Sequence, residues 1–463
     1  MIYLIVGASC AGKSSFVKNS FLKGKNHTEF RDLMTITETD DCYLIGTYVS
    51  ENRTVGTDRV SRADIPKFFE QIKRLYGKGK DIVLEGDKIC SHKFFGELAE
   101  SGFECKLYWI RCKTSTSIAR NKANNTTCSE SYLTAVASKA RNIFYDFCFV
   151  FDGEIFDTDD ITDFSNFSKE TAKPVESSKK MRDDFAVFIL SHGRADNMRT
   201  LKPLLRGGYT GKWYIVIDNE DKTADEYRKL YGDRVIVFDK LAVSETFDTG
   251  DNFPDRCAVV YARRACFDIA EKMGIKYFLQ LDDDYQRFLY RWIDGDLLAS
   301  KDILKLDKVF EAMICFLDET DTTTIAFAQG GDFIGGTKSA NANKGMLRKA
   351  MNTFFCRTDR RIDFIGKQNE DVSTYVRWGG TGQLFFTFTG VNIVQIPTQS
   401  LSGGMTALYR DGGTFIKSFY TVMYCPSCVK VAMMGDVNYR LHHNINWRCA
   451  VPKILSEDWK IQK

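Results

Sequence analysis

Long hydrophobic runs are absent from this 463-residue sequence. No apolar stretch approaches the roughly twenty residues that a membrane-spanning helix needs, so we expect no membrane partner. A strong net charge is absent as well. The formal charge is only +3 at pH 7, which excludes a basic field over the whole molecule and leaves any nucleic-acid contact to local patches. No internal repeat is present.

Cysteine is present without the spacing of a disulfide framework. The fourteen cysteines are scattered, and the sequence opens on a predicted strand and a glycine-rich loop instead of a signal peptide. These features predict reduced thiols and a cytoplasmic protein. Cys425 and Cys428, with Cys449 and His442, could form a four-ligand zinc set. Because no second paired motif accompanies them, reduced structural cysteines are the alternative interpretation.

A phosphate-binding motif lies at the start of the chain. Residues 7–14 fit the pattern G-x-x-x-x-G-K-[ST] in full, between an apolar run at 2–6 and a predicted helix at 15–22. In this motif, backbone N–H groups surround the β-phosphate, Lys13 bridges the β- and γ-phosphates, and the Ser14 hydroxyl ligates Mg²⁺. The predicted ATP-binding residues are Gly7, Gly12, Lys13, Ser14 and Ser15.

Strands and helices alternate after this motif, as in a parallel sheet with crossover helices. The predicted strand 81–84 ends at Glu85 and Asp87, which we expect to assist Mg²⁺ or to act as a base. A polar helical stretch further on carries Arg120, which could close on transferring phosphate like a lid arginine. A surface helix with an ordinary arginine is the alternative.

A polar segment divides the chain. Residues 156–182 are rich in Asp, Ser, Thr and Lys and show little periodicity, which indicates a linker. We therefore predict an α/β protein with an N-terminal domain over 1–155 and a C-terminal domain over 183–463. A new predicted strand begins after it at Phe185, which supports this division.

The C-terminal domain reads as a nucleotide-binding series of strands and helices. The predicted elements are strands 185–190, 213–217 and 234–238, helix 258–272 and strand 277–281. The last strand delivers Asp282, Asp283 and Asp284 to a strand end, where such sheets bind ligands. Carboxylate oxygens suit Mg²⁺ or Mn²⁺, and a cation on a diphosphate would stabilise its departure. A simple acidic turn is the alternative.

Two short motifs give the N-terminal domain a family resemblance. The segment Val55-Gly-Thr-Asp58-Arg59 precedes Glu85-Gly-Asp87, and this arrangement resembles the bacteriophage P-loop kinases that phosphorylate 5-hydroxymethyluracil in DNA. The resemblance implies that the P-loop holds ATP and Mg²⁺ and that Asp58 and Arg59 meet the acceptor. A solvated turn is the alternative for this pair. In a bacteriophage the protein would work in the cytoplasm of the infected host.

The C-terminal domain resembles a GT-A (Rossmann-like) glycosyltransferase, and more narrowly the TET/JBP-associated glycosyltransferases of bacteriophages. Four segments carry the resemblance: Ile189-Leu-Ser-His-Gly-Arg194, Val216-Ile-Asp-Asn219, Leu279-Gln-Leu-Asp-Asp-Asp284 and Gln368-Asn-Glu-Asp371. The implied ligand is a sugar-nucleotide, a UDP-sugar in the first place. The residues implied to bind it are His192, Arg194, Asp218 and Asp283, with a Mn²⁺ or Mg²⁺ ion on Asp282 and Asp284.

Two further groups follow from the same resemblance. Glu370 and Asp371 are implied to lie on the acceptor side as catalytic carboxylates, although capping a helix is an alternative for the Asn-Glu-Asp motif. His442 is implied to complete the metal site, because GT-A enzymes often bring a C-terminal histidine to the ion. A core or surface histidine is the alternative.

The two domains together suggest an enzyme that hypermodifies DNA bases. A GT-A domain would transfer a sugar to a hydroxymethylated pyrimidine, and a P-loop kinase domain would act on the hydroxymethyl group, with the base flipped out of the duplex. Arg59, Arg357, Arg360 and Arg361 would contact phosphates. The rival is a small-molecule kinase fused to a glycosyl- or nucleotidyltransferase of surface-polymer synthesis. In a third, non-enzymatic interpretation, the P-loop only senses nucleotides or docks.

Overall fold

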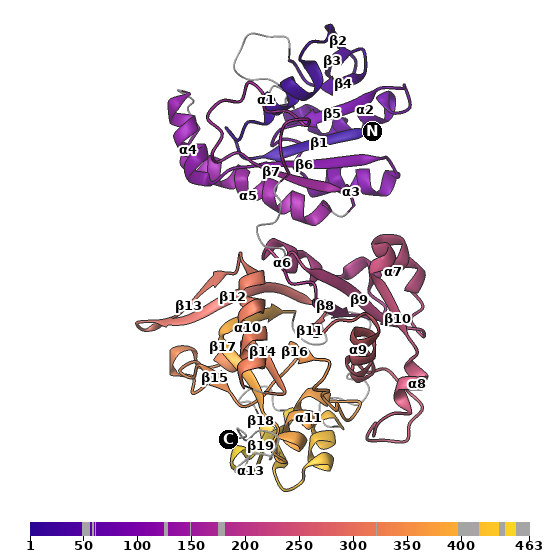
Figure 1. Cartoon of the computed structure of the whole chain (residues 1–463), viewed down its shortest axis with the longest axis vertical. Helices are drawn as coiled ribbons and strands as arrows, with labels where there is room; N and C mark the ends of the chain where they lie inside the picture. The colour runs from indigo at the N-terminus through magenta and orange to yellow at the C-terminus, as the bar shows by residue number, and fades with distance from the viewer. Residues whose placement is uncertain are drawn as a thin grey trace. The chain divides into compact units, whose positions relative to one another are not determined.

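The computed structural model divides the chain into two compact units, Met1–Ser178 and Lys179–Lys463. It describes residues 1–48, 56–57, 60, 62–124, 128–148, 150–174, 181–320, 322–396, 416–434 and 440–450. Both units are built of helices on sheets, which confirms the predicted α/β class (Figure 1). No helix in these ranges combines the length and the apolar character that a membrane crossing requires.

The first unit is a seven-stranded sheet in the order β2-β3-β4-β5-β1-β6-β7. Strands β4 to β7 and β1 run parallel, whereas β2, β3 and β4 pair antiparallel. The strands are β1 (Ile2–Gly7), β2 (His27–Arg31), β3 (Thr35–Thr39), β4 (Cys42–Ile45), β5 (Asp81–Glu85), β6 (Cys105–Arg111) and β7 (Gly153–Asp157). The helices are α1 (Lys13–Val17), α2 (Phe68–Leu75), α3 (His92–Ser101), α4 (Thr114–Ala123) and α5 (Glu130–Phe147).

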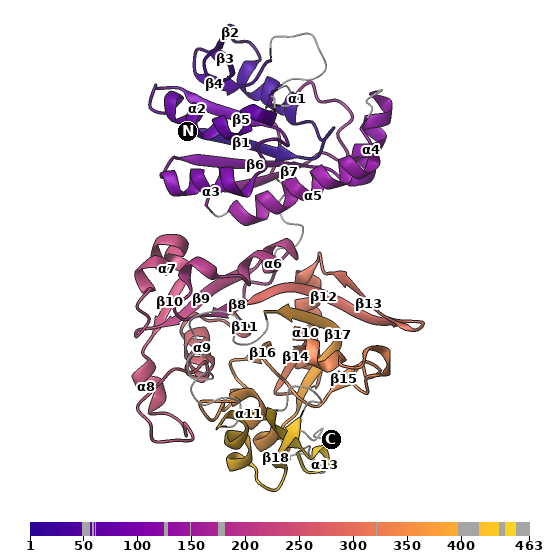
Figure 2. The same cartoon turned by 180° about the vertical axis from the view of Figure 1, so that it is seen from behind.

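Both faces of this sheet are covered, which explains why its central strand is an unbroken apolar run. Ile2, Leu4 and Val6 of β1 pack with apolar side chains of α2, α3 and α5, while Ile5 packs on the opposite side with Phe16 of α1. Figures 1 and 2 show these helices on the two sides of the sheet. The sheet thereby fixes the loop that follows β1.

The structure differs from the predicted linker over residues 156–174. Phe156 ends the sheet in β7 and is buried, and Phe167 is buried as well. The side-chain amide of Asn19 donates to the carbonyl oxygens of Phe164 and Phe167 at 2.7 and 3.2 Å. These phenylalanines anchor an otherwise polar run to the first unit, whose end lies at Ser178. Residues 175–180 of the predicted linker lie outside the described residues.

The second unit contains a ten-stranded mixed sheet and a separate hairpin. The main path is β10-β9-β8-β11-β16-β14-β17-β12-β13, with β15 paired to β17. The strands are β8 (Phe185–Leu190), β9 (Lys212–Asp218), β10 (Val235–Phe238), β11 (Tyr277–Asp282), β12 (Tyr285–Asp294), β13 (Leu297–Asp302), β14 (Thr324–Ala328), β15 (Met346–Leu347), β16 (Phe354–Arg357) and β17 (Phe385–Gln395). Strands β18 (Val429–Met434) and β19 (Arg440–Ile445) form the hairpin.

Helices cover both faces of this sheet too. They are α6 (Leu201–Arg206), α7 (Ala224–Tyr231), α8 (Lys240–Ser244), α9 (Val260–Lys272), α10 (Leu306–Thr320), α11 (Glu370–Gly379) and α13 (Trp447–Ala450). Phe188 of β8 packs in a core shared with α9 and α11, and the neighbouring Phe185 packs against Phe310 of α10 on the other side. The C-terminal hairpin joins the α9 side of this core through Val429. Strands β8, β9 and β11 are parallel, so their carboxyl ends meet at one edge.

Candidate functional sites

The first candidate site is the loop between β1 and α1. Gly12 has φ 96°, and a Cβ atom there would lie 2.2 Å from the ring of Phe164. A Cβ on Gly7 would lie 2.2 Å from the carbonyl oxygen of Ile110. Any larger residue at either position would therefore push the loop away from its neighbours. The two glycines of the motif keep the backbone in a compact turn ahead of the helix.

Lys13 and Ser14 have well-defined contacts at the start of α1. The Lys13 ammonium is buried and donates to the carbonyl oxygens of Gly7 and Ala8 at 3.3 and 2.8 Å. The Ser14 hydroxyl donates to Glu85 Oε2 at 3.3 Å, and Glu85 ends the adjacent strand β5. A hydroxyl beside a buried carboxylate at a strand end is a suitable place for Mg²⁺. Ser15 lies in the first turn of α1.

The other residues predicted for this site have different surroundings. The Arg120 guanidinium donates to the carbonyl oxygens of Cys10 and Ile161 at 3.3 and 2.7 Å, and lies 5.0 Å from the Phe164 ring centre. These contacts tie the loop after β1 to residues 158–164, and the role of Arg120 toward a phosphate stays a prediction. The Asp87 carboxylate accepts a hydrogen bond from Tyr132 at 3.1 Å.

Asp58 and Arg59 lie outside the described residues. The preceding residues, Gly56 and Thr57, are described. The Thr57 hydroxyl donates a hydrogen bond to the backbone carbonyl oxygen of Glu85. A Cβ atom on Gly56 would lie 2.7 Å from the side-chain oxygen Oε1 of the same residue. Glu85 is thus the carboxylate at which the P-loop and residues 56–57 meet.

The second candidate site lies at the carboxyl ends of β8, β9 and β11. His192 follows β8, and its Nδ1 lies 2.7 Å from Asp218 Oδ2 at the end of β9. The buried Lys240 ammonium lies 3.2 Å from the same oxygen. Burial alone would raise the pKa of Asp218, but the contacts with His192 and Lys240 lower it. The hydrogen bond to Asp218 raises the pKa of His192, so the pair favours a charged imidazole.

Asp283 points into the protein. Its carboxylate accepts hydrogen bonds from Arg194 at 2.8 Å and from the Ser191 hydroxyl at 2.5 Å, and only 5% of the residue is exposed. Arg194 and Asp283, two of the four residues predicted to bind the sugar-nucleotide, therefore bind each other. Their ion pair holds the loop after β8 against the end of β11.

Asp284 has a different environment. Its Oδ1 atom is buried without a hydrogen-bond partner. Burial, with the charges of Asp282 and Asp283, raises the pKa of Asp284 to about 7. A buried carboxylate oxygen without a donor is costly for a folded protein unless a proton or a cation compensates it. This observation is the strongest support within the triplet for a cation ligand.

Asp282 is bridged to Glu370 by a buried arginine that the sequence analysis missed. Arg263 of α9 is 1% exposed, and its guanidinium donates to Asp282 Oδ1 and to Glu370 Oε1, both at 2.9 Å. Burial raises the pKa of Glu370 to about 7, with Asp371 adding to the rise and Arg263 opposing it. Burial likewise raises the pKa of Asp282 despite the opposing charge of Arg263. The predicted acceptor-side carboxylate Glu370 is therefore attached to the triplet.

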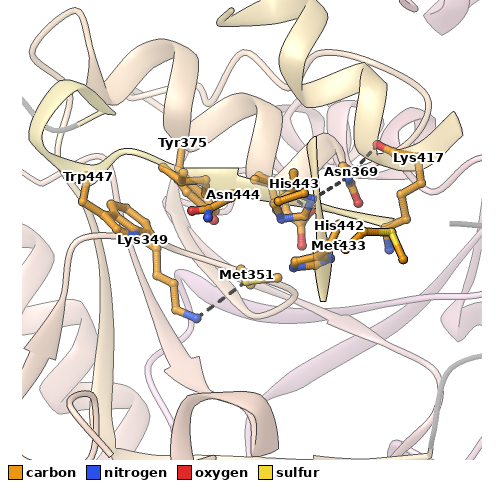
Figure 3. A pocket seen from close by; sticks show the side chains of 14 residues that line it. Lys349, Met351, Asn369, Tyr375, Lys417, Met433, His442, His443, Asn444 and Trp447 are labelled. Carbon is orange, nitrogen blue, oxygen red and sulfur yellow. Dashed lines mark hydrogen bonds between the residues drawn. The ribbon is translucent and has the colours of Figure 1, made fainter. Parts of the chain in front are cut away.

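Asp371 and His442 meet in a pocket of about 590 Å³ (Figure 3). The pocket lies between α11 and the β18–β19 hairpin, and His443 also lines it. Asn369 donates to Nδ1 of His443 at 3.2 Å, and burial lowers the pKa of His443 to about 3. Among the residues that the structure describes, no three His, Cys, Asp or Glu side chains are arranged to hold a metal ion. The role of His442 as a metal ligand stays a prediction.

Two other predictions concern a zinc site and arginines that contact DNA phosphates. Cys425, Cys428 and Cys449 are free thiols and, within the described ranges, belong to no metal-binding group. The arginines predicted to contact phosphates are occupied: Arg357 pairs with Asp318 and Asp359, Arg361 pairs with Asp268, and Arg360 donates to the carbonyl oxygens of Leu317 and Thr322. Arg357 and Arg361 are thus each paired with carboxylates, Arg59 lies outside the described residues, and the contact with DNA stays a prediction.

The carboxylates at the strand ends lie within a region that matches a known family. Residues 185–404 match the family model described as TET-Associated Glycosyltransferase. The second unit contains a glycosyltransferase-family domain. The resemblance predicted for this domain is thereby confirmed, and the match includes the Asp triplet, Arg263, Glu370 and Asp371 but ends before the β18–β19 hairpin. The kinase resemblance of the first unit gains no support from the comparisons.

One similar solved structure is that of a mannose-1-phosphate geranyltransferase from Thermus thermophilus. It is 12% identical in sequence, and the alignment covers 52% of this chain and 64% of that one, with a TM-score of 0.18. The TM-score is too low for this likeness to bear on the fold. No curated protein matches the chain.

Proposed function

We propose that the second unit transfers a sugar from a sugar-nucleotide to a hydroxymethylated pyrimidine in DNA. The family match supports glycosyl transfer, and the buried, unpaired Oδ1 of Asp284 supports a donor site at the strand ends. A diphosphate leaving group needs positive charge close to it, and carboxylates can supply that charge only through a bound cation. Asp284 and Asp282 would hold a Mn²⁺ or Mg²⁺ ion, which would offset the charge of the departing diphosphate.

The chain's own residues would position the donor and the acceptor. His192, positioned by its contact with Asp218, would interact with the nucleotide portion of the donor. Arg263 would keep Asp282 and Glu370 in place, and Asp371, the carboxylate that reaches the pocket, would accept the proton of the attacking hydroxyl. We assign this role to Asp371 instead of Glu370 because Arg263 already engages Glu370.

For the first unit we propose ATP and Mg²⁺ binding at the P-loop, followed by phosphoryl transfer to the hydroxymethyl group of the base. The support is the buried Lys13, the contact of Ser14 with Glu85 and the approach of residues 56–57 to Glu85. Glu85 would organise the ion and its water ligands.

The rival acceptor is a small molecule of surface-polymer synthesis. The neutralised state of Arg357 and Arg361 favours it, because DNA binding depends on unpaired positive charge. The family match, which names an association with TET proteins, favours a base in DNA.

The test of the donor site is turnover of a sugar-nucleotide panel by Asp284→Asn. Loss of the carboxylate charge is expected to lower turnover by roughly 100-fold while the fold stays intact, a typical loss when a transition-state charge interaction is removed. Asp294→Asn, at an exposed position of β12, is the matched control. Equal turnover by the two variants would remove Asp284 from the site.

A further inference from the structure

The pocket of about 590 Å³ lies beside the proposed donor site but is not part of it. Asp371 lines the pocket, and the preceding Glu370 is joined through Arg263 to Asp282 by two contacts of 2.9 Å. Pockets for small ligands commonly measure about 300 to 1,000 Å³, so this one can hold a ligand of nucleoside size. The connection through Arg263 thus joins Glu370, the residue next to Asp371, to the carboxylate at the end of β11.

The pocket has charged as well as neutral polar groups, and Asp371 and Lys417 are among the charged ones. The Asn369 amide donates a hydrogen bond to Nδ1 of His443. Lys349 forms an ion pair with Asp332, which satisfies its charge. Asn444 adds another amide. Figure 3 shows Lys349, Asn369, His443 and Asn444 around the cavity. The two amides and the imidazole offer hydrogen-bond donors and acceptors to the edge of a heterocyclic ring.

The pocket also has an aromatic wall. Tyr375 and Trp447 are stacked, with ring centres 5.8 Å apart and planes within 8° of each other. Tyr375 is 4% exposed and fixes the pair to α11, whereas Trp447 is 40% exposed. Partly exposed indole next to amide groups is the arrangement on which flat heterocycles stack in nucleic-acid-binding proteins.

We propose that this pocket is the acceptor site, in which a pyrimidine extruded from DNA stacks on Trp447 with its hydroxymethyl group toward Asp371. The assignment rests on the proposed function of the second unit. In the reaction, the hydroxymethyl O–H bond breaks and its proton passes to Asp371. The oxygen forms a bond to the anomeric carbon of the sugar, and the bond from that carbon to the diphosphate oxygen breaks. The nucleoside diphosphate leaves with the electron pair.

The proposal assigns specificity to residues beyond the matched family region. Trp447 and His443 follow residue 404, where the match ends, so the acceptor site would be completed by the C-terminal hairpin and α13. Stacking on an aromatic side chain contributes about 1 to 3 kcal/mol per base, and about 1.4 kcal/mol corresponds to a factor of ten. Truncating the indole is therefore expected to lower kcat/KM for DNA by about 5- to 150-fold.

The experiment compares Trp447→Ala and Trp447→Phe with the unaltered protein. Trp292→Ala is the matched control, because Trp292 is 44% exposed and lies on β12, outside this pocket. Three quantities are measured for each: KM for hydroxymethylated DNA, KM for the sugar-nucleotide, and the slow hydrolysis of the sugar-nucleotide without acceptor. We expect Trp447→Ala to raise only the KM for DNA, Trp447→Phe to keep most of the affinity, and Trp292→Ala to change nothing.

Unchanged donor hydrolysis by Trp447→Ala would show that the variant is folded. If the unaltered protein glycosylates DNA and Trp447→Ala has the same KM for DNA, the assignment of the pocket is overturned while the proposed function stands. A raised KM for the sugar-nucleotide alone would place the sugar ring here and also overturn the assignment. If the unaltered protein glycosylates no DNA, the proposed function fails and the assignment fails with it.

Discussion

Replacing Arg263 with methionine tests the electrostatic centre of the second unit. Arg263 is 1% exposed and contacts Asp282 and Glu370 at 2.9 Å each. Methionine keeps most of the side-chain volume but removes the positive charge that contacts both carboxylates. Removing one partner of a buried ion pair costs about 3 to 5 kcal/mol, because the remaining charge is left uncompensated. We expect a loss of this size in the free energy of unfolding at pH 8.

The loss should depend on pH. The pKa of Glu370 is raised to about 7 in the folded protein, from 4.5. An acid with a raised pKa holds more protons when folded, so its stability contribution is most favourable below pH 4.5 and declines as the pH rises through 7. At pH 5 Glu370 is already neutral, and Arg263→Met is expected to cost up to about 1.4 kcal/mol less than at pH 8, because pH 8 lies one unit above the pKa of about 7 and one unit corresponds to about 1.4 kcal/mol.

The assay is urea unfolding followed by tryptophan fluorescence. Five of the six tryptophans follow residue 178, and Trp109 alone lies in the first unit, so the signal reports mainly on the second unit. Arg361→Met is the matched control, because Arg361 and its partner Asp268 are each about half exposed and such a pair contributes about 0 to 1 kcal/mol.

A double variant completes the test. Adding Glu370→Gln to Arg263→Met removes one of the two uncompensated carboxylates and should recover about 1 to 3 kcal/mol at pH 8. If Arg263→Met costs no more than Arg361→Met, or if Glu370→Gln restores nothing, the buried bridge does not stabilise the site as argued.

Three further predictions concern the binding sites. Lys13→Ala should abolish ATP binding measured by calorimetry, since it removes the charge that neutralises the phosphates, while sugar transfer continues; loss of both would mean that the units depend on each other. Asp218 raises the pKa of His192 above 6.5, so their mutual stabilisation is complete below pH 6.5 and is lost as the pH rises through the raised pKa. The thermal unfolding midpoint of the unaltered protein should therefore fall more between pH 6 and 8 than that of His192→Gln. A chelator should stop sugar-nucleotide turnover and Mn²⁺ or Mg²⁺ restore it; full turnover in the chelator would exclude a cation on Asp282 and Asp284.

The elements that carry the candidate sites could be predicted because local pattern determines them. The apolar runs of β1, β8 and β11 are buried on both sides, and such strands need no long-range information to be recognised. The P-loop follows from its glycines, whose positions the structure explains by close contacts with Ile110 and Phe164. The ends of the parallel strands then bring His192, Asp218 and the Asp triplet to one edge.

The partners of these residues could not be predicted in the same way. Arg263 and Arg264 are adjacent in a helix, and charged residues are expected to be exposed to solvent. Arg263, however, lies on the same helical face as Val260, three residues before it, and Phe267, four residues after it, and these two apolar residues are buried. That spacing is the signal that could have found Arg263. Its partner Glu370 is more than 100 residues away, and no local pattern reveals such a contact. The polar composition after Phe156 predicted a linker, but the two buried phenylalanines Phe156 and Phe167 anchor this segment to the first unit.

The most direct test of the central claim is mass spectrometry of nucleosides from hydroxymethylated DNA incubated with the protein and a panel of sugar-nucleotides. Parallel reactions include or omit ATP, and unmodified DNA of the same sequence serves as the control acceptor. The account predicts a hydroxymethylpyrimidine nucleoside heavier by one sugar residue, formed only with hydroxymethylated DNA and lost in Asp284→Asn. Glycosylation of a small-molecule acceptor with no change in any DNA nucleoside would contradict it.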